Sequence, residues 1–310
     1  MMTTSSAPGK IILFGEHAVV YGRPALAVPV AQVQATATVS ATSRTGLWIE
    51  APDVGLSSEL SRLSPDHPLV AVIQSVLSAL GISSPPPLTV HVTSTIPVAS
   101  GLGSGAAVSI AIIRALSAFF GHPLPDERVS ALTYEVEKLH HGTPSGIDNT
   151  VITYAKPVYF IKNQPIEIFQ VAKPFTILIG DTGRASPTRA VVGDVRKLWE
   201  AEPVRFEKIF DSVAGIARKA RKAIESGETH LLGALMNENH TLLQQMTVSS
   251  PELEHLVEAA RAAGADGAKL SGGGRGGNMI ALVRPENAKE ISAALLKSGA
   301  RRTIITTVTG

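Results

Sequence analysis

Residues 97–109 read PVASGLGSGAAVS and join a strand-like run at residues 88–93 to a long apolar stretch. This segment contains Gly101, Gly103 and Gly105, and glycine lets the backbone adopt positive φ and bring several N–H groups toward one point. A helix that starts here adds its unpaired N–H groups and the positive end of its dipole. A strand, a glycine turn and a helix N-terminus together predict an anion site, most often one for phosphate.

Two familiar nucleotide-binding motifs do not fit this turn. No Lys-Ser or Lys-Thr pair follows the last glycine, so the turn is not a Walker loop, and its spacing is not the GxGxxG of dinucleotide-binding folds. A tightly packed turn without a ligand is the alternative. Other motifs in the chain are needed to distinguish a phosphate site from a packed turn.

Length and composition favour a protein of two domains. With 310 residues, 44% of them hydrophobic and 17% charged, the chain is long enough for two sizeable cores. A net charge of +2 without a long basic run argues against a nucleic-acid-binding face, and the absence of cysteine excludes disulfides, thiolate metal sites and a cysteine nucleophile. The start, MMTTSS, lacks a signal-peptide pattern, and the most apolar stretch, residues 106–120, is too short to span a bilayer. We therefore expect a cytoplasmic protein.

Polar residues follow a short apolar strand near the N-terminus. Residues 11–14 form this strand, which ends at Gly15, and Glu16 and His17 come next. Polar residues beside a glycine at a strand end commonly lie at the mouth of a cleft. Taken alone, a solvated Lys10 and a turn capped by Glu16 and His17 are the more ordinary interpretation.

The rest of the N-terminal half predicts one long strand and three helices. Alternating apolar residues favour a strand with one wet face at residues 25–39. Helical spacing predicts helices over residues 67–80, 106–120 and 126–139. The second of these is apolar on nearly all sides and must be buried, which would hold the glycine turn rigidly at its N-terminus.

Two carboxylates flank the loop after the third helix. Glu137 lies near the end of that helix, where a negative charge is unfavourable to the dipole and a cation nearby would compensate. Asp148 lies beyond the loop. A solvated Glu137 and an Asp148 that caps the next element are the alternatives. The adjacent His140 and His141 match no HExxH pattern, so we expect no metal site there.

The C-terminal half has a different order of elements. Its expected strands lie at residues 175–179, 267–270, 279–283 and 303–308, and its expected helices at 205–226, 231–246, 251–263 and 286–297, with a polar loop after Asp181 that opens a further helix. This is the split βαββαβ order. Between two of the strands, residues 271–277 read SGGGRGG, and a plain hairpin would need fewer glycines.

Three segments, APGKIILFGEH, PVASGLGSGAA and KLSGGGRGGNM, resemble the GHMP small-molecule kinases in sequence, order and spacing. The runs GKIILFGEHAVVYG, HGTPSGIDN and TRAVVGDVR resemble the branch that phosphorylates mevalonate, whereas galactokinases carry GEHxDY at the first site. The resemblance covers most of the chain. It implies ATP-dependent phosphorylation of the primary hydroxyl of (R)-mevalonate, a step of isoprenoid biosynthesis.

The resemblance also implies an α+β fold of two domains. A domain similar to ribosomal S5 domain 2 would occupy residues 1–172 and a ferredoxin-like domain residues 173–310, with ATP in the cleft between them. The implied cofactors are ATP and Mg²⁺. The implied assembly is a homodimer that needs neither nucleic acid nor a membrane.

The resemblance assigns a role to each candidate site residue. The glycine turn would hold the ATP phosphates through backbone N–H groups. The nucleotide-binding residues would be Pro97, Ser100, Gly101, Leu102, Gly103, Ser104, Gly105 and Ala106. Glu137 and Ser104 would ligate Mg²⁺, which typically takes one or two protein oxygens and keeps several waters. Asp148 would take or orient the proton of the substrate hydroxyl, and Lys10, if paired with it, would keep that carboxylate ionised. The substrate side would be lined by Lys10, Glu16, His17, Asp148, Thr188, Ser271 and Gly272.

The chain departs from the family pattern in two places. Many relatives read GLGSSAA in the glycine turn, and the second serine is the usual magnesium ligand; here that position is Gly105, so either Ser104 turns inward or water replaces the hydroxyl. The third motif usually reads TGAGGGGC, and here it has Ser271, Gly273, Arg275 and Asn278. Arg275 would either add a charge to the phosphate site or face solvent.

Three other functions are compatible with the same motifs. The enzyme could phosphorylate another hydroxylated molecule, such as phosphomevalonate, homoserine or a sugar. It could be a decarboxylase of the same superfamily, which would release carbon dioxide. A non-catalytic nucleotide sensor is the third, but a sensor would be expected to lose Lys10 or Asp148, and both are present.

Overall fold

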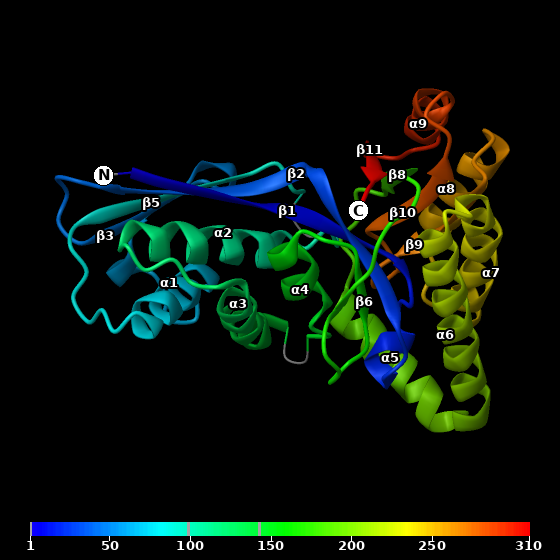
Figure 1. The fold of residues 1–310 in the computed structure, drawn as a ribbon, viewed down its shortest axis with the longest axis horizontal. Helices are drawn as coiled ribbons and strands as arrows, with labels where there is room; N and C mark the ends of the chain where they lie inside the picture. Colours follow the sequence, from blue (N-terminus) through cyan, green and yellow to red (C-terminus); the bar gives the residue numbers. More distant parts are fainter. Residues whose placement is uncertain (1, 98–99, 142–143) are drawn as a thin grey trace. The chain divides into compact units, whose positions relative to one another are not determined.

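The computed structural model describes residues 2–97, 100–141 and 144–310 (Figure 1). Val98 and Ala99 of the glycine turn lie outside the described residues. So do the side chains of His140 and His141, for which the sequence predicts no metal site.

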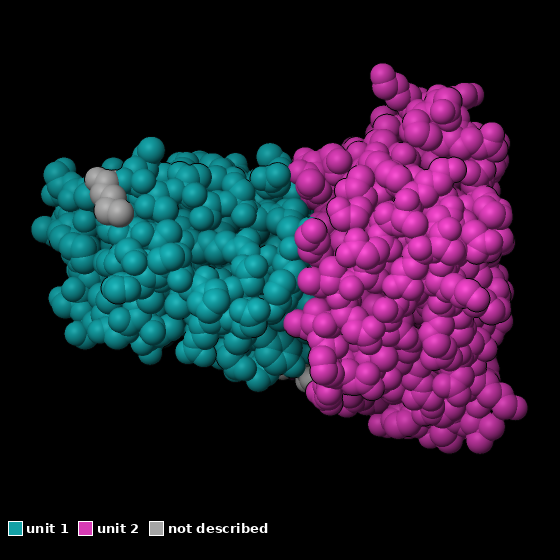
Figure 2. Space-filling model, in the orientation of Figure 1, with its two compact units in different colours: residues 1–9, 33–98, 103–155 teal, residues 10–32, 99–102, 156–310 magenta. Residues whose placement is uncertain are grey.

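The chain divides into two compact units, coloured separately in Figure 2. Unit 1 consists of Met1–Gly9, Val33–Val98 and Gly103–Ala155, and unit 2 consists of Lys10–Gln32, Ala99–Leu102 and Lys156–Gly310. Each unit is therefore built from three separate stretches of chain. The sequence domains expected at residues 1–172 and 173–310 stay a prediction.

Unit 1 contains a mixed sheet. Its strands are parts of β1 (Met2–Phe14) and β2 (Ala25–Ala41) together with β3 (Leu47–Ala51), β4 (Leu56–Glu59) and β5 (Leu88–Ser94), in the order β4-β3-β5-β2, with β1 also paired to β2. β2 runs antiparallel to β5, and β3 runs parallel to it. The predicted alternation is confirmed over residues 33–39, because Ala35, Ala37 and Val39 are fully buried and the residues between them are not. Residues 25–28 are buried on both faces.

The strand β1 starts at Met2, nine residues before the apolar run that predicts it. The early residues are small and polar, so no hydrophobic pattern marks them. Their pairing with β2 includes two hydroxyl–hydroxyl hydrogen bonds, Thr4 to Thr38 at 3.0 Å and Ser6 to Thr36 at 2.8 Å. Cross-strand pairs of this kind stabilise a half-exposed strand without apolar side chains.

The helices among the described residues of unit 1 lie on one side of its strands (Figure 1). They are α1 (Pro68–Ala79), α2 (Ser104–Phe119), α3 (Asp126–His141) and α4 (Ile147–Tyr154). α2 is buried on nearly all sides, as predicted, because it contacts β5 and the other three helices. α4 is not predicted by the sequence, since it is short and rich in β-branched residues that favour strands. The side chain of Asn149 ties it to α3 by donating to the Ser130 hydroxyl at 2.8 Å.

Unit 2 contains a four-stranded antiparallel sheet. Its strands are β8 (Phe175–Asp181), β9 (Gly267–Ser271), β10 (Asn278–Val283) and β11 (Arg302–Val308), in the order β11-β8-β10-β9. This order confirms the predicted ferredoxin-like arrangement. The start of β2 pairs with β6 (Val158–Phe160), which pairs with β7 (Glu167–Ile168).

In the described part of unit 2 the helices are α5 (Thr188–Ala201), α6 (Pro203–Ser226), α7 (Leu232–Gln245), α8 (Pro251–Ala262) and α9 (Ala288–Lys297). α7 and α8 contact β9, and α9 contacts β8 and β11. Short 3₁₀ turns lie at Ala18–Tyr21 (η1), Pro52–Val54 (η2), Leu60–Arg62 (η3) and Thr229–Leu231 (η4). No helix among the described residues is long and apolar enough to cross a membrane.

The turn η1 is part of the core of unit 2. Ala18 is fully buried in the main cluster of apolar side chains, and the ring of Tyr21 stacks on Phe210 of α6 at 4.2 Å between centroids. The guanidinium of Arg23 pairs with Glu207 and with Asp211, also on α6. These contacts fix the segment that carries Glu16 and His17 against α6.

A close approach of two backbones positions α7 on β9. A Cβ added to Gly233 of α7 would collide with the carbonyl group of Asp266, and one added to Gly267 of β9 would collide with Gly233 itself. Both positions therefore require glycine for space. The contact sets the depth at which α7 presents its side chains to the end of β9.

We expect Gly233→Ala to lower the free energy of unfolding by about 1–3 kcal/mol or more, because α7 has to move away from β9. Gly215→Ala on α6 is the matched control, since a Cβ there meets nothing within 4 Å. That change should stabilise the protein by up to about 1 kcal/mol through helix propensity. Urea denaturation of both variants measures the difference, and equal stabilities would contradict the close approach.

Candidate active site

The glycine turn has the backbone conformation that its sequence predicts at two of three glycines. Gly101 has φ of 84° and Gly103 has φ of 76°, and Gly103 is the N-cap of α2. Gly105 lies within the first turn of α2 and is not among the positive-φ residues. Because glycine supplies no capping side chain, the first N–H groups of α2 are not taken up by one.

Glu137 of α3 lies beside Gly105 within unit 1. Its carboxylate is largely buried, with the residue 8% exposed, and Oε1 is 3.2 Å from the place a Cβ on Gly105 would occupy. Glycine therefore leaves room for the carboxylate, and a serine at this position would put its side chain against it. The packing of α2 on α3 thus places Glu137, one of the two predicted metal ligands, beside the residue that follows the other, Ser104.

Asp148 lies in the first turn of α4, where the helix dipole favours a negative charge. It is half-buried. α4 contacts both α2 and α3, so the same three helices of unit 1 carry Ser104, Glu137 and Asp148.

In unit 2 the strand β1 meets the beginning of the glycine turn. Lys10 is buried, and its backbone N–H donates to the carbonyl of Leu102 at 3.0 Å. Ser100 and Leu102 are buried as well. The structure thus joins the first and second sequence motifs through main-chain contact. Pro97, also buried, belongs to unit 1.

The glycine-rich loop after β9 forms a second group of predicted residues. Ser271 is buried and donates its hydroxyl to the carbonyl of Ile12 at 2.7 Å, and Gly272 follows it with φ of 86°. A Cβ on Gly273 would lie 2.6 Å from the hydroxyl oxygen of Thr188, at the start of α5. The structure therefore brings Thr188 against this loop, and the substrate-side role of these residues stays a prediction.

Glu16 forms a fully buried ion pair with Lys269 of β9. The ammonium group of Lys269 also donates to its neighbouring Leu270 carbonyl at 2.7 Å, and Asn239 of α7 donates to the other oxygen of Glu16 at 3.4 Å. Burial lowers the pKa of Lys269, and the charge of Glu16 opposes that shift. The place of Glu16 on the substrate side stays a prediction.

His17 is neutral at physiological pH. Burial lowers its pKa to about 4, while the hydrogen bond to the backbone of Gly273 acts in the opposite direction and the charge of Arg275 adds to the lowering. Its Nε2 lies 3.0 Å from the Gly273 carbonyl, which only accepts, so Nε2 carries the proton. Nδ1 is then left as a hydrogen-bond acceptor.

Arg275 is held by protein partners. Its guanidinium pairs with Asp194 of α5 at 2.7 Å and donates to the Thr247 carbonyl at 3.2 Å, and the first of these contacts lowers the pKa of Asp194. These partners argue against plain solvation of Arg275, and a contact with phosphate stays a prediction. The residue ties the glycine-rich loop to α5 and to the turn before α8.

Sequence reasoning missed Lys269 and Asn239. Lys269 stands in the strand GAKLS, which is otherwise apolar or small, and a charged residue in a buried strand signals an unseen partner. Nothing in the sequence identifies that partner as Glu16, which is far away in the chain. Asn239 is one of several polar residues on α7 and carries no such signal.

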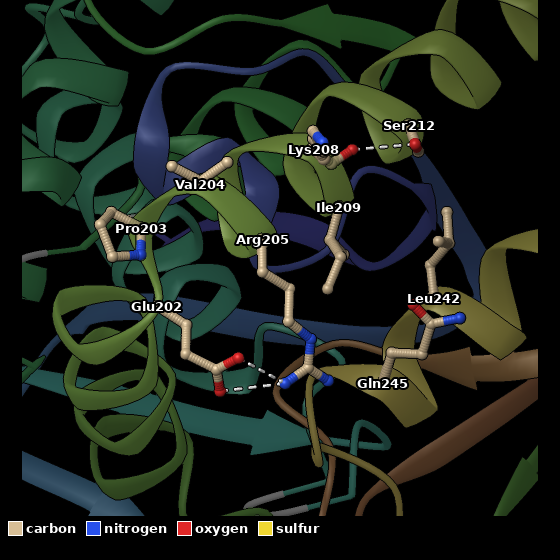
Figure 3. A pocket seen from close by; sticks show the side chains of 9 residues that line it. All are labelled: Glu202, Pro203, Val204, Arg205, Lys208, Ile209, Ser212, Leu242 and Gln245. Carbon is tan, nitrogen blue, oxygen red and sulfur yellow. Dashed lines mark hydrogen bonds and ion pairs between the residues drawn. The ribbon is translucent and has the colours of Figure 1, made fainter.

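A separate hollow of about 620 Å³ is lined by the first turns of α6 and the last turn of α7 (Figure 3). Its lining residues are Glu202, Pro203, Val204, Arg205, Lys208, Ile209, Ser212, Leu242 and Gln245. Arg205 pairs with Glu202, three residues before it in the chain, at 3.0 Å. None of the predicted site residues lines this hollow.

Comparisons with known families match both halves of the chain. The GHMP kinases N terminal domain matches residues 68–156, and the GHMP kinases C terminal domain matches residues 220–301. A mevalonate kinase of Thermococcus sibiricus is 38% identical over 96% of this chain and 94% of its own length. One of Pyrococcus furiosus is 35% identical over the same shares.

Solved structures agree in fold over nearly the whole chain. The L. major mevalonate kinase in complex with R-mevalonate has a TM-score of 0.86 and 30% identity, and covers 99% of this chain and 95% of its own. The Methanococcus jannaschii mevalonate kinase has a TM-score of 0.85 and 27% identity, with coverage of 99% and 98%. A Streptococcus pneumoniae phosphomevalonate kinase, at a TM-score of 0.81 and 18% identity, shares the fold.

We expect Lys269→Met to destabilise the protein by roughly 3–5 kcal/mol, because it leaves the Glu16 carboxylate buried without its charge partner. The double change Glu16→Leu with Lys269→Met removes both charges and should recover much of that loss. Lys197→Met, in an exposed pair with Asp194, is the control and should change stability little. Urea midpoints measure all three, and a Lys269→Met variant as stable as the control would contradict a buried pair.

Proposed function

The chain belongs to the GHMP kinases, in the group of the mevalonate kinases, and we propose that it transfers the γ-phosphoryl group of ATP to the primary hydroxyl of (R)-mevalonate, which gives 5-phosphomevalonate and ADP. The observation that carries this proposal is 38% identity to a mevalonate kinase along nearly the full length of both chains. A related structure holds R-mevalonate. A homodimer in the cytoplasm is part of the same proposal.

In this reaction the substrate hydroxyl oxygen forms a bond to the γ-phosphorus as the bond to the β-phosphate oxygen breaks. The hydroxyl proton leaves, and we assign it to the carboxylate of Asp148 as base. The positive charge of Lys10 would stabilise the negative charge that develops on the attacking oxygen. Phosphoryl transfer depends mainly on positioning and electrostatics, so this small set of groups is sufficient.

The glycine turn is the proposed phosphate cradle. Gly101 and Gly103 have positive φ, and the N-terminus of the 16-residue helix α2 follows them. Both features support binding of the β- and γ-phosphates by the backbone of residues 100–106. This mode needs no Walker lysine. The hydroxyl of Ser104, the first residue of α2, is available at the same place.

The residues near α2 fit a magnesium ion. Mg²⁺ in kinases uses one or two carboxylates plus substrate phosphates, and the buried Glu137 beside Gly105 supplies one. No group of three or more acidic or histidine side chains is placed to hold a metal within residues 2–97, 100–141 and 144–310, and such a cluster is not needed. When bound, the ion neutralises phosphate charge. Glu137 would hold it, with Ser104 as a second ligand.

The substrate side is proposed at the end of β9 and the start of α5. Thr188 and the backbone of Ser271 and Gly272 offer donors there, and neutral His17 offers Nδ1 as an acceptor for a hydroxyl. Glu16 would act on this side through the segment it anchors or by direct contact.

We expect ADP release that depends on both Mg²⁺ and (R)-mevalonate, with a product that carries one added phosphoryl group by mass spectrometry. The panel also includes phosphomevalonate, homoserine and galactose, and carbon dioxide is measured to detect a decarboxylase. Efficient turnover of another acceptor without mevalonate activity would contradict the proposed substrate. Nucleotide binding without turnover of any acceptor would instead indicate a sensor.

Glu137→Gln should lower kcat by about two to three decades and raise the Mg²⁺ concentration needed for half-maximal rate, because a charged ligand is lost. Glu135→Gln is the matched control, since Glu135 is two residues away on α3 and 64% exposed in a pair with Lys138. It should retain wild-type kinetics. A folded Glu137→Gln enzyme with normal turnover and normal Mg²⁺ dependence would show that the metal site lies elsewhere.

A further inference from the structure

Asn278 occupies the first position of β10, directly after the glycine-rich loop. The residue is only 1% exposed. It is paired in register with Ser271 of β9 on one side and with Asp181 of β8 on the other. With both neighbouring strands in place, the position of its backbone is fixed, and its side chain starts from a rigid element.

The amide of Asn278 holds one carbonyl of the phosphate turn. Its Nδ2 donates to the carbonyl oxygen of Ser100 at 2.6 Å. Gly277, the residue before it, leaves space for the same carbonyl, because a Cβ there would lie 3.3 Å from that oxygen. Ser100 and residues 277–278 all belong to unit 2.

The other amide atom of Asn278 is left without a partner. Its Oδ1 is buried and accepts no hydrogen bond. The amide cannot turn round to relieve this, because Oδ1 would then face the Ser100 carbonyl oxygen. A buried acceptor without a hydrogen bond lowers the free energy of unfolding. Proteins retain such an acceptor where another atom of the same side chain, here Nδ2, is needed for function.

Holding a carbonyl also orients the next N–H group. In a planar trans peptide the C=O of one residue and the N–H of the next point in opposite directions. With the Ser100 carbonyl on Asn278, the N–H of Gly101 points away from β10. The Leu102 carbonyl is held in the same way by the N–H of Lys10, which orients the N–H of Gly103.

Both oriented N–H groups remain available. Neither Gly101 nor Gly103 donates its N–H to any other described residue. Backbone N–H groups that are oriented in this way and donate to no described residue are suited to binding an anion. We propose that Asn278 is a positioning residue that sets the phosphate-binding conformation of this turn. This inference rests on the proposed function, since ATP supplies the phosphate.

The test compares nucleotide affinity in three variants. Asn278→Ala removes the donor. Asn278→Asp keeps the shape but places a carboxylate oxygen against the Ser100 carbonyl. Asn237→Ala is the control: its Oδ1 accepts from the N–H of Ala268 at 3.1 Å in the same unit, away from the turn. Calorimetry with ADP and with a non-hydrolysable ATP analogue gives Kd without an acceptor, and kinetics give KM for ATP and for mevalonate.

We expect Asn278→Ala to raise the Kd for both nucleotides about tenfold, in line with the loss of one well-formed hydrogen bond, and Asn278→Asp to raise it further. The KM for ATP should rise with it, while the KM for mevalonate stays within about twofold of wild type. Asn237→Ala should lower thermal stability and leave nucleotide affinity unchanged. A merely structural Asn278 would behave like this control.

Wild-type nucleotide affinity in a folded Asn278→Ala variant would overturn the inference and leave the proposed function standing. Unfolding of both Asn278 variants would overturn it too, in favour of a purely structural role. Wild-type protein that binds nucleotide in an Asn278-dependent way but releases no ADP with mevalonate would contradict the proposed function alone.

Discussion

The buried ion pair between Glu16 and Lys269 is the interaction on which the arrangement of unit 2 depends. It joins the segment after the first strand to the strand that leads into the glycine-rich loop, across 253 positions of sequence. Two charges without access to water are tolerable only when each is fully paired. Here the carbonyl of Leu270 and the amide of Asn239 supply the remaining hydrogen bonds. The pair therefore specifies one register of these segments and penalises others.

Around that pair, each motif is attached to another by a different kind of contact. The Ser271 hydroxyl bonds the carbonyl of Ile12, and His17 bonds the carbonyl of Gly273. The amide of Asn278 and the N–H of Lys10 hold two carbonyls of the glycine turn. Nearly all of these bonds end on backbone carbonyls, so they fix the conformation of loops rather than the positions of single side chains. A phosphate site made of N–H groups depends on such a fixed backbone conformation.

Much of the fold follows from local sequence pattern. The spacing of Leu69, Ile73 and Val76 predicts α1 to within one residue at each end, and the continuous apolar run from Ala106 predicts the burial of α2. Local pattern does not predict the polar start of β1 or the short helix α4. Contacts with β2 and with α3 stabilise these elements, and their own composition does not. The local sequence pattern contains no information about stabilisation by such tertiary contacts.

The candidate site also combines features that local sequence predicts with features that depend on tertiary packing. Glycine spacing predicts the turn, and positive φ at Gly101 and Gly103 confirms its conformation. The meeting of Glu137 with Gly105 depends on how two helices pack, and the partner of Arg275 depends on where α5 lies, so neither can be derived from spacing. The chemical roles of Lys10, Asp148 and Glu137 stay predictions.

The division of each unit into three stretches of chain has a consequence for synthesis on the ribosome. Ala18 and Tyr21 leave the ribosome early, yet the core they complete includes Phe210 of α6 and the strands β8–β10, which are made much later. Until then these apolar groups have no native partner. Unit 2 cannot close before most of the protein exists, and non-local contacts of this kind slow folding. The nascent N-terminal segment is thus the part of the molecule with the longest exposure to aggregation and to chaperones.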